Sequence, residues 1–553
     1  MSDDFDDPYL AEQRRKALIR NVIIGALLVG AVATVFVVRA RKAARVERVL
    51  ASSEALMELG TFEDLRDAAK AVAEEASGDD LAPAAFHIQG LKADLAIWAL
   101  YNGSQSQAAH AEQLLEAAKV RGPLDHATQL GEALMLAIRG DTTTALSLLG
   151  IEGRTGPEGP WQAVARSEAS LRSGDIAGAR AALGGCTVGL CLAWSARIAM
   201  DTGEWDAAAA TADVLLEQTP THSFGLTARA LALPEGPYDA GRVKSLQRFM
   251  ESTELPPLLS ARVVVALTRA LRRSEGSERA DALLEQALEA SPESTLLARE
   301  VSRSKRYQGY FGAAWTRADK ALRSVPTDPG LIAELSSALY FNDAAELLLD
   351  RLEPARRSGG GDGVRRGDAI VSLTKGLWGT AIEGLVATRH LGEPGDADLY
   401  LAEAYLGAGK HAQAADAARR AWGALSVTFG ADSREAAVAK MYEGLAVGLG
   451  GDPEAADAIL EAAYSKDVRT VWGAWLYARY HKGMNRPREA KDAYLIACHN
   501  GQDFALACLA LAEIYDSLQM DAIMRRTQQE ARRQYLRQSP KGWNAPRVKA
   551  ALQ

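Results

Sequence analysis

Small and aliphatic residues recur at helical spacing along almost the whole chain. Between residues 49 and 537, alanine and leucine return at intervals of three, four or seven, which places them on one face of an α-helix. Alanine, leucine, glutamate and arginine lose little side-chain freedom in a helix, and these residues dominate the composition of the segments. Glycine or proline separates one segment from the next. The pattern predicts an all-α protein.

A phrase that begins with a turn glycine and ends with alanine repeats along the chain. It reads GDTTTA at 140–145, GDIAGA at 174–179 and GEWDAA at 203–208. Gly140 and Gly174 are 34 residues apart, and so are Ala280 and Ala314. Small residues at these positions let the second helix of a pair approach the first closely, and the glycine turns the chain between them. One such pair cannot bury its own apolar face, so neighbouring pairs must stack.

The period and the phrase resemble the tetratricopeptide repeat (TPR). The resemblance implies an α-solenoid of about 13–14 stacked antiparallel helix pairs. The expected repeat-packing signature consists of turn glycines and of small residues that pack between helices: Gly140, Ala145, Gly174, Ala179, Gly203, Ala208, Ala280, Gly309, Ala314, Ala381, Gly409, Ala414, Gly444, Ala456 and Ala490.

The spacing also predicts how the chain is divided. A first solenoid portion, of one or more segments, covers 39–357 and a C-terminal segment covers 364–537. Between them, SGGGDG at 358–363 predicts a hinge loop, because consecutive glycines do not hold a helix. The chain begins with a short polar tail over 1–21 and closes with a basic tail over 538–553.

An uncharged apolar run lies near the N-terminus. Residues 22–38 read VIIGALLVGAVATVFVV, 17 residues without a charge, with Arg20 before them and Arg39, Arg41 and Lys42 after them. The run predicts a transmembrane helix, and with the repeats it resembles bacterial single-span TPR proteins of the inner membrane. A cleaved signal peptide is the alternative, because Ala31-Val32-Ala33 has the form of a cleavage site.

The four cysteines form two close pairs in sequence, Cys186 with Cys191 and Cys498 with Cys508. Close pairs suit disulfides in an oxidising compartment, which favours a periplasmic body. Four buried small hydrophobic residues are the alternative. The basic residues on both sides of the apolar run leave a cytoplasmic body open.

Charge and motifs restrict the classes of function. The 553 residues are 48% hydrophobic and 24% charged, with a net charge of −8. The acidic body argues against nucleic acid as a partner, because such proteins present a basic surface. The sequence contains no phosphate-binding loop, no dinucleotide fingerprint, no metal-binding motif and no catalytic constellation. We therefore expect no catalytic residues, no cofactor and no metal, and a protein that is not an enzyme.

The resemblance implies a concave groove lined by the first helix of each unit. Its register places two rows of side chains in this groove, Leu296, Arg299, Arg303 and Arg306 in one unit and Trp472, Trp475, Arg479 and Lys482 in another. Arginines on one helical face suit carboxylates of a partner, and tryptophans beside cations suit an anchor for a bound segment. A solvated basic face is the alternative for the first row, and packing between repeats is the alternative for the tryptophans.

Together these features predict a membrane-anchored scaffold or adaptor. It would bind a protein or peptide partner in the TPR groove, with a role in secretion or envelope assembly. The alternative is a structural subunit of a large membrane-associated complex or oligomer. Neither the identity of the partner nor the oligomeric state follows from the sequence, because the residues that line repeat grooves vary freely on one scaffold.

Overall fold

The computed structural model describes most of the chain. The described residues are 8–77, 83–103, 105–121, 126–150, 159–232, 240–326, 328–341, 345–357, 361–464, 470–501 and 504–538.

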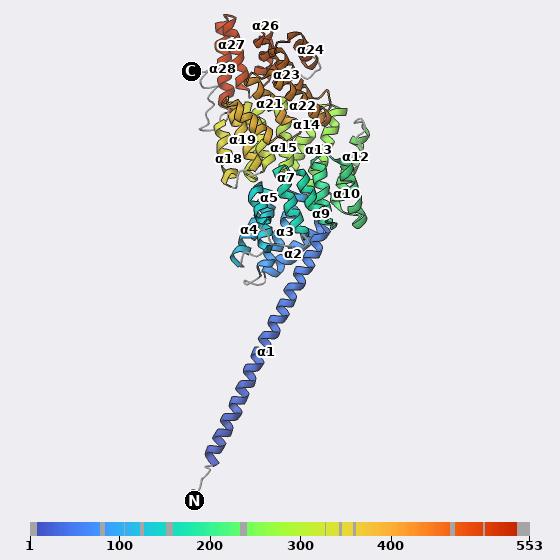
Figure 1. Cartoon of the computed structure of the whole chain (residues 1–553), viewed down its shortest axis with the longest axis vertical. Helices are drawn as coiled ribbons and strands as arrows, with labels where there is room; N and C mark the ends of the chain where they lie inside the picture. The colour runs from blue at the N-terminus through green and yellow to red at the C-terminus, as the bar shows by residue number, and fades with distance from the viewer. Residues whose placement is uncertain are drawn as a thin grey trace.

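Within these ranges every regular element is a helix, and Figure 1 follows them from the N-terminal stalk to the far end of the body. The first part contains α1 (Pro8–Leu59), α2 (Phe62–Ser77), α3 (Ala84–Ile97), a π-helical segment (Trp98–Asn102), α4 (Gln105–Arg121), α5 (His126–Arg139), α6 (Thr142–Leu149), α7 (Pro160–Ser173), α8 (Ile176–Leu183) and α9 (Gly189–Asp201). The middle contains α10 (Trp205–Gln218), α11 (Ser223–Leu231), α12 (Ala240–Ser252), α13 (Pro257–Ser274), α14 (Ser277–Ala290), α15 (Thr295–Gln308), α16 (Phe311–Ser324), α17 (Pro329–Phe341), α18 (Ala345–Arg357) and α19 (Gly361–Thr374). The last part contains α20 (Trp378–Ala387), α21 (Asp396–Gly407), α22 (His411–Phe429), α23 (Arg434–Leu449), α24 (Pro453–Tyr464), α25 (Val471–Gly483), α26 (Pro487–Asn500), α27 (Ala505–Ser517) and α28 (Asp521–Gln538).

Consecutive helices from α2 to α28 pack against one another as a TPR-like solenoid. The turn between α7 and α8 shows how the sequence builds a unit. Gly174 ends α7 in the left-handed region at φ 87°, which glycine adopts without steric cost, and the next residue, Asp175, caps α8 by accepting a hydrogen bond from the backbone N–H of Gly178. The two residues at the start of the repeated phrase therefore end one helix and begin the next.

The small residues of the repeat-packing signature lie between the paired helices. Each of its alanines, from Ala145 to Ala490, has no exposed surface. Gly444 shows why size matters, because a Cβ atom placed there would lie 2.5 Å from Cγ of Leu460 on the paired helix α24. A larger side chain at such a position would force the helices apart, and packed interiors tolerate this poorly.

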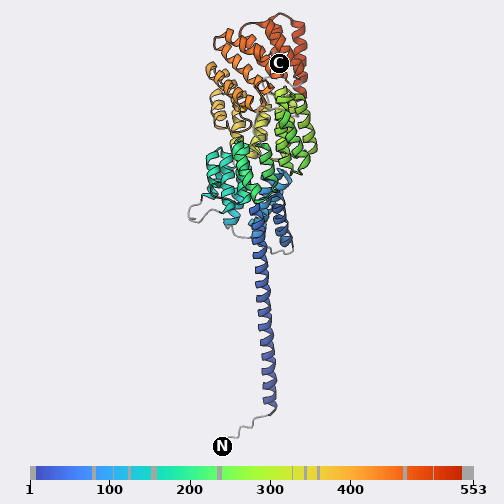
Figure 2. The same ribbon diagram turned by 90° about the vertical axis from the view of Figure 1, so that its right-hand side faces the viewer.

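The long helix α1 projects from the body as a stalk, and only its C-terminal part packs on the solenoid (Figures 1 and 2). Over the residues that the structure describes, no helix combines the length and the apolar character that crossing a bilayer requires. The apolar run between Arg20 and Arg39 is shorter than the about 20 apolar residues of a typical crossing. The predictions of a transmembrane helix over 22–38, of a single-pass inner-membrane protein and of a periplasmic body are therefore corrected.

The predicted hinge loop at 358–363 is also corrected in part. Residues 358–360 lie outside the described residues, but 361–363 form the first turn of α19. Gly361 meets the carbonyl oxygen of Gly140, and Gly363 lies against Pro329, each so closely that a Cβ atom would not fit. The glycines after residue 360 thus serve close packing at the start of a helix.

The solenoid folds back on itself, so that helices far apart in sequence meet. Helix α13 contacts α22, and α15 contacts both α23 and α25. Gly309, at the turn after α15, touches Val471 at the start of α25, and the ring of Phe311 lies against the rings of Trp472 and Phe504. We call this contact between α13–α15 and α20–α25 the seam. It closes part of the space that an open superhelix would leave as a groove.

Both cysteine pairs form disulfides. Cys186 precedes α9 and is joined to Cys191 in that helix, and Cys498 of α26 is joined to Cys508 of α27.

Candidate functional site

The predicted basic row on α15 lies in the seam. Leu296 and Arg299 at its start are half-buried, whereas Arg303 and Arg306 are 2% and 0% exposed. The faces of α13 and α15 that a groove would present to a partner are covered by residues from α20 onward.

The carboxylates that meet this row come from the same chain. Arg303 donates from Nη1 to Glu300 at 2.7 Å and to Glu393 at 2.8 Å. Arg306 donates from Nη2 to Glu334 at 3.0 Å and to Asp396 at 2.7 Å. Two of these four acceptors, Glu393 just before α21 and Asp396 at its first position, lie about ninety residues further along the chain.

We call residues 388–395, which connect α20 to α21, the acidic turn, and we include in it Asp396 at the first position of α21. Arg366 holds it in place, donating from Nη2 to the backbone carbonyls of Thr388 at 2.6 Å and Leu391 at 3.2 Å. Arg269 of α13 donates to Glu393 at 2.8 Å as well. The acidic turn thus enters the seam as an internal ligand of the arginines.

The electrostatics of the seam favour the ionised forms of most of its groups. Burial alone raises the pKa of Glu300, but the charges of Arg303, Arg269 and other arginines outweigh burial and lower it to about 2. Burial likewise opposes ionisation of Asp396, and the charge of Arg306 lowers its pKa. Glu334 differs, because burial dominates there and raises its pKa. A buried network of this kind is stable only while each charge keeps its partner.

The second predicted row, on α25, is divided between the protein core and the surface. Trp472 at its start is fully buried, and its ring lies in an aromatic cluster with Tyr307, Phe341 and Tyr442. Trp472 therefore packs between repeats, which is the alternative that the sequence leaves open for the tryptophans.

Trp475, Arg479 and Lys482 remain on a surface that a ligand can reach. They line a pocket of about 540 Å³ together with aliphatic residues of α23 and α27. We call it the α25 pocket, lined by Leu445, Leu449, Trp475, Arg479, Lys482, Gly483, Tyr494, Leu506 and Ala510.

The two cations of the α25 pocket are held differently. Arg479 stacks over the ring of Trp475 at 4.6 Å and donates to Glu403 at 2.7 Å, and its side chain is 26% exposed. Lys482 donates to Glu513 at 2.6 Å, but both side chains are largely in solvent. An exposed pair of this kind contributes little to stability, so Glu513 can be exchanged for another carboxylate.

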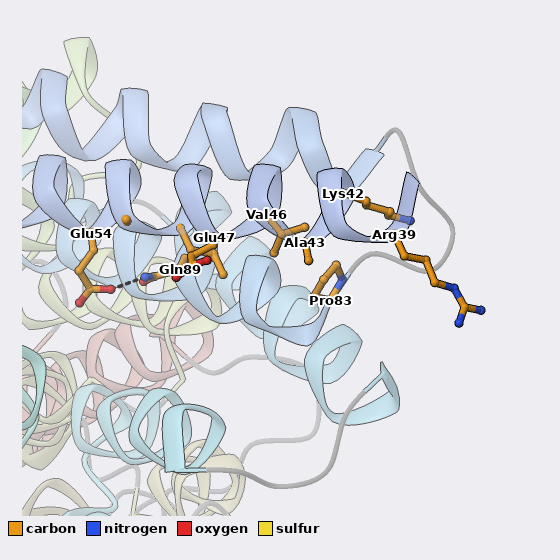
Figure 3. A pocket seen from close by; sticks show the side chains of 10 residues that line it. Arg39, Lys42, Ala43, Val46, Glu47, Glu54, Pro83 and Gln89 are labelled. Carbon is orange, nitrogen blue, oxygen red and sulfur yellow. Dashed lines mark hydrogen bonds between the residues drawn. The ribbon is translucent and has the colours of Figure 1, made fainter. Parts of the chain in front are cut away.

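A second cavity, of about 740 Å³, lies at the foot of the body between α1 and the start of α3. Figure 3 shows its walls, with Val46 and Ala43 of α1 facing Pro83, and Arg39 and Lys42 at one end. Glu54 accepts a hydrogen bond from Gln89 near the other end.

Within the described part of the chain, no group of three or more histidine, cysteine, aspartate or glutamate side chains could hold a metal ion.

The repeat pattern does not identify the residues that fill the seam. It does not point to Glu393, Asp396 or Glu334, although GEPGDAD at 392–398 combines a turn signal with three carboxylates. This cluster, which falls where the repeat phrase has no counterpart, is the signal that could have found them.

Comparisons with known proteins do not assign the chain to a family. No protein-family model matches it, and no curated protein matches it. Among solved structures, it is similar to the APC/C hetero-tetramer Cut9–Hcn1, with 13% identity over 88% of this chain and 86% of that chain, at a TM-score of 0.41. Two structures of monomeric IFIT1 mutants, one with m7Gppp-AAAA and one with Gppp-AAAA, show 14% and 15% identity over 88% of this chain and 99% of theirs, each at a TM-score of 0.28. The TPR-like repeat fold of this chain rests on its own helix pairs.

Proposed function

We propose that this chain is a protein-binding scaffold whose α25 pocket receives a segment of a partner protein. The segment carries an apolar side chain next to a carboxylate. The observation that carries the proposal is the α25 pocket itself, where Trp475, Arg479 and Lys482 stand beside aliphatic walls on a surface open to solvent. The chain acts by binding rather than by catalysis. The expected role in secretion or envelope assembly finds no support in the structure.

The apolar side chain of the partner would enter between the aliphatic walls. Leu445 and Leu449 come from α23 and Leu506 from α27, and Trp475 lines the same pocket. The ring of Trp475 is held by edge contacts with Phe341 at 5.9 Å and Phe504 at 5.4 Å. A tryptophan fixed in this way loses little freedom on binding, which favours affinity.

The carboxylate of the partner would bind Lys482. Arg479 is committed to Glu403, whose side chain is 9% exposed, and it also supports the tryptophan ring by stacking. Lys482 is 45% exposed and its partner Glu513 is 61% exposed. Exchange of one exposed carboxylate for another is inexpensive, so this cation supplies orientation and selectivity for acidic segments.

Selection of random peptides against the purified full-length protein tests the proposal. We expect enriched peptides to share an aliphatic or aromatic residue followed closely by aspartate or glutamate. Trp475→Ala should weaken their binding by about 30-fold or more, as for a central anchor residue. Lys482→Glu should weaken it by about ten-fold.

Lys410→Glu is the matched control, because Lys410 is an exposed lysine on a helix turn outside the pocket. It changes the net charge of the protein as Lys482→Glu does, and it should leave peptide binding unchanged. Peptides that bind the two pocket variants as tightly as the wild type would refute the α25 pocket as the binding site.

A further inference from the structure

The two disulfides of the chain differ in how closely solvent approaches them. Cys186 is half-buried in a turn at the surface, whereas its partner Cys191 has no exposed surface. Cys498 and Cys508 are 1% and 0% exposed, so both ends of the second disulfide lie inside the protein. The exchange of a disulfide with a thiol requires access to one of its sulfurs. The first disulfide is therefore the more accessible of the two in the folded protein.

The turn that carries Cys186 has few other attachments to the body. Gly185 and Thr187 on either side are exposed, and a Cβ atom on Gly185 would meet nothing within 4 Å. The backbone N–H of Cys186 donates to the carbonyl oxygen of Leu183 at 2.9 Å. The exposed side chain of Gln218 donates to the carbonyl oxygen of Thr187 at 3.2 Å. The disulfide is thus the one covalent restraint on a turn that is otherwise lightly held.

The disulfide also restrains the first turn of α9. This helix begins at Gly189, and Val188 at the N-cap position makes no side-chain hydrogen bond to the free N–H groups of the turn. Cys191 is the third residue of the helix, so its bond to Cys186 ties the first turn to the chain before it. The disulfide therefore stabilises a helix start that no side chain caps.

The end of the stalk packs on this same turn of α9 (Figure 1). The carbonyl oxygen of Leu59 lies so close to Gly189 that a Cβ atom would not fit there. A Cβ atom on Gly60 would lie 2.6 Å from the backbone nitrogen of Leu190. We call this contact of residues 59–60 with residues 189–190 the stalk joint. Because backbone meets backbone directly, a movement of the first turn of α9 also moves the contact with the stalk.

We propose that the Cys186–Cys191 disulfide is a site of reversible reduction by dithiols, and that its reduction makes the stalk joint more mobile. The buried Cys498–Cys508 disulfide stays oxidised under the same conditions.

The reaction is a thiol–disulfide exchange. One thiolate of the dithiol attacks Sγ of Cys186, the S–S bond breaks, and Cys191 leaves with the electron pair and takes up a proton. The second thiolate of the dithiol attacks its own sulfur in the mixed disulfide, which releases Cys186 to take up a proton and leaves the dithiol as a cyclic disulfide. In sum the dithiol loses two electrons and two protons, and the two cysteines gain them.

The folded protein can accommodate the reduced form. Sγ of Cys191 lies 3.8 Å from the backbone carbonyl oxygen of Pro160, which can accept a hydrogen bond from the new thiol. The two cysteines are five residues apart, and a disulfide that closes so short a loop contributes less to stability than one that closes a long loop. Tyr101 still donates from its hydroxyl to the carbonyl oxygen of Gly60. The stalk therefore stays attached after reduction, with a more mobile joint.

Alkylation after mild reduction tests the site. The native full-length protein is treated with dithiothreitol, the reaction is stopped with acid, and free thiols are labelled with N-ethylmaleimide in denaturant. Mass spectrometry then measures the label on each cysteine. We expect Cys186 and Cys191 to become labelled about ten-fold faster than Cys498 and Cys508, or more, because of the difference in access. Equal rates, or reduction of the first disulfide only after urea unfolds the protein, would overturn the proposed site.

Hydrogen exchange tests the consequence for the stalk. Backbone amides in residues 187–192 and 56–61 should exchange about ten-fold faster or more after reduction, because the first turn of α9 opens more often. Peptides from α27 should be unchanged, since their disulfide remains oxidised. A reduced first disulfide with unchanged exchange in residues 56–61 would overturn the proposed effect on the stalk joint.

Serine variants separate this local effect from a general one. Protein with both Cys186→Ser and Cys191→Ser should exchange at the stalk joint as fast as the reduced wild type, with or without dithiothreitol. Protein with both Cys498→Ser and Cys508→Ser is the matched control, and its stalk joint should respond to dithiothreitol as that of the wild type does. Equally fast exchange at the stalk joint of this control without dithiothreitol would contradict a local effect.

The redox site and the proposed function can fail independently. The stalk joint lies at the opposite end of the body from α25 (Figure 1). Selective reduction of Cys186–Cys191 should therefore leave peptide binding at the α25 pocket unchanged, and the absence of peptide binding would not alter the labelling or the exchange rates.

Discussion

The basic rows on α15 and α25 have the same register and opposite environments. Arg303 and Arg306 are enclosed in the seam and bound to carboxylates of the same chain, whereas Arg479 and Lys482 line the open α25 pocket. The difference comes from the acidic turn, which is distant in sequence but packs in the seam, where its carboxylates accept hydrogen bonds from Arg303 and Arg306. A groove position on a repeat helix therefore specifies where a side chain points, and distant segments decide whether a ligand can reach it.

We call the α15 row in the seam the closed row and the α25 row at the pocket the open row. The largest effect is expected from breaking the ion pairs of the closed row. Arg306→Met leaves Glu334 and Asp396 buried without their shared cation, and removal of one partner from a buried ionic network costs about 3–5 kcal/mol of unfolding free energy. Urea unfolding followed by circular dichroism measures it.

The open row supplies the control for this substitution. Lys482→Ala removes one cation of an exposed pair and should cost less than about 1 kcal/mol. If Arg306→Met proves too unstable to purify, Glu393→Gln, which removes one charge of the same network, should still destabilise more than Lys482→Ala. Equal effects in the two rows would contradict the comparison.

An intermediate effect is expected from the disulfide that supports the open pocket. Cys498 and Cys508 join α26 to α27, which supply Tyr494 and Leu506 to its wall. Replacement of both cysteines by serine releases a loop closed over ten residues, which corresponds to about 2–3 kcal/mol of unfolding free energy. We also expect weaker peptide binding, because the wall becomes less rigid.

The other disulfide is the matched control for peptide binding. Serine at both Cys186 and Cys191 should lower stability by about 2 kcal/mol, because that loop is shorter, and should leave the affinity for peptides unchanged. Fluorescence anisotropy with a labelled selected peptide distinguishes the two variants. A loss of binding in both would point to a general loosening of the solenoid instead of a local effect.

A further effect concerns the dependence of the stability on pH. The folded-state pKa of Glu300 is lowered to about 2 from its usual 4.5, so the ionised group stabilises the closed row above pH 4.5, and this contribution is lost as the pH falls from 4.5 towards 2. Glu334, whose pKa is raised, acts in the opposite direction. Glu300→Gln should therefore flatten the decline of stability between pH 4.5 and 2, as measured by thermal unfolding at several pH values.

An unchanged slope in Glu300→Gln would show that other carboxylates of the seam dominate its acid response. Glu513→Gln is the control at the open row, and it should leave the slope as it is, because Glu513 is exposed.

The sequence predicts the local part of this fold well. Alanine at fixed spacing after a turn glycine identifies helix pairs, because close helix packing admits only small residues at those positions, and Ala145, Ala280 and Ala414 are fully buried. The pocket residues Trp475, Arg479 and Lys482 followed from the same register.

The seam could not be predicted in the same way. Repeat periodicity describes contacts between neighbours, whereas Arg306 and Asp396 are 90 residues apart. The glycine-rich run that ends at Gly363 predicts a hinge because consecutive glycines weaken a helix, but the tight contact of Gly361 with Gly140 is not visible in the sequence. Long-range closure depends on the summed curvature of all repeats, which no single motif encodes.

The seam has a mechanical consequence. An open solenoid extends like a spring under tension, because each repeat is held only by its neighbours and yields in turn. Here a pull on the ends would first load the ion pairs that join α13 and α15 to the acidic turn. The molecule would resist stretching until these ion pairs break together, and it would then lengthen abruptly. Its extension would therefore begin at a threshold force instead of increasing gradually with force.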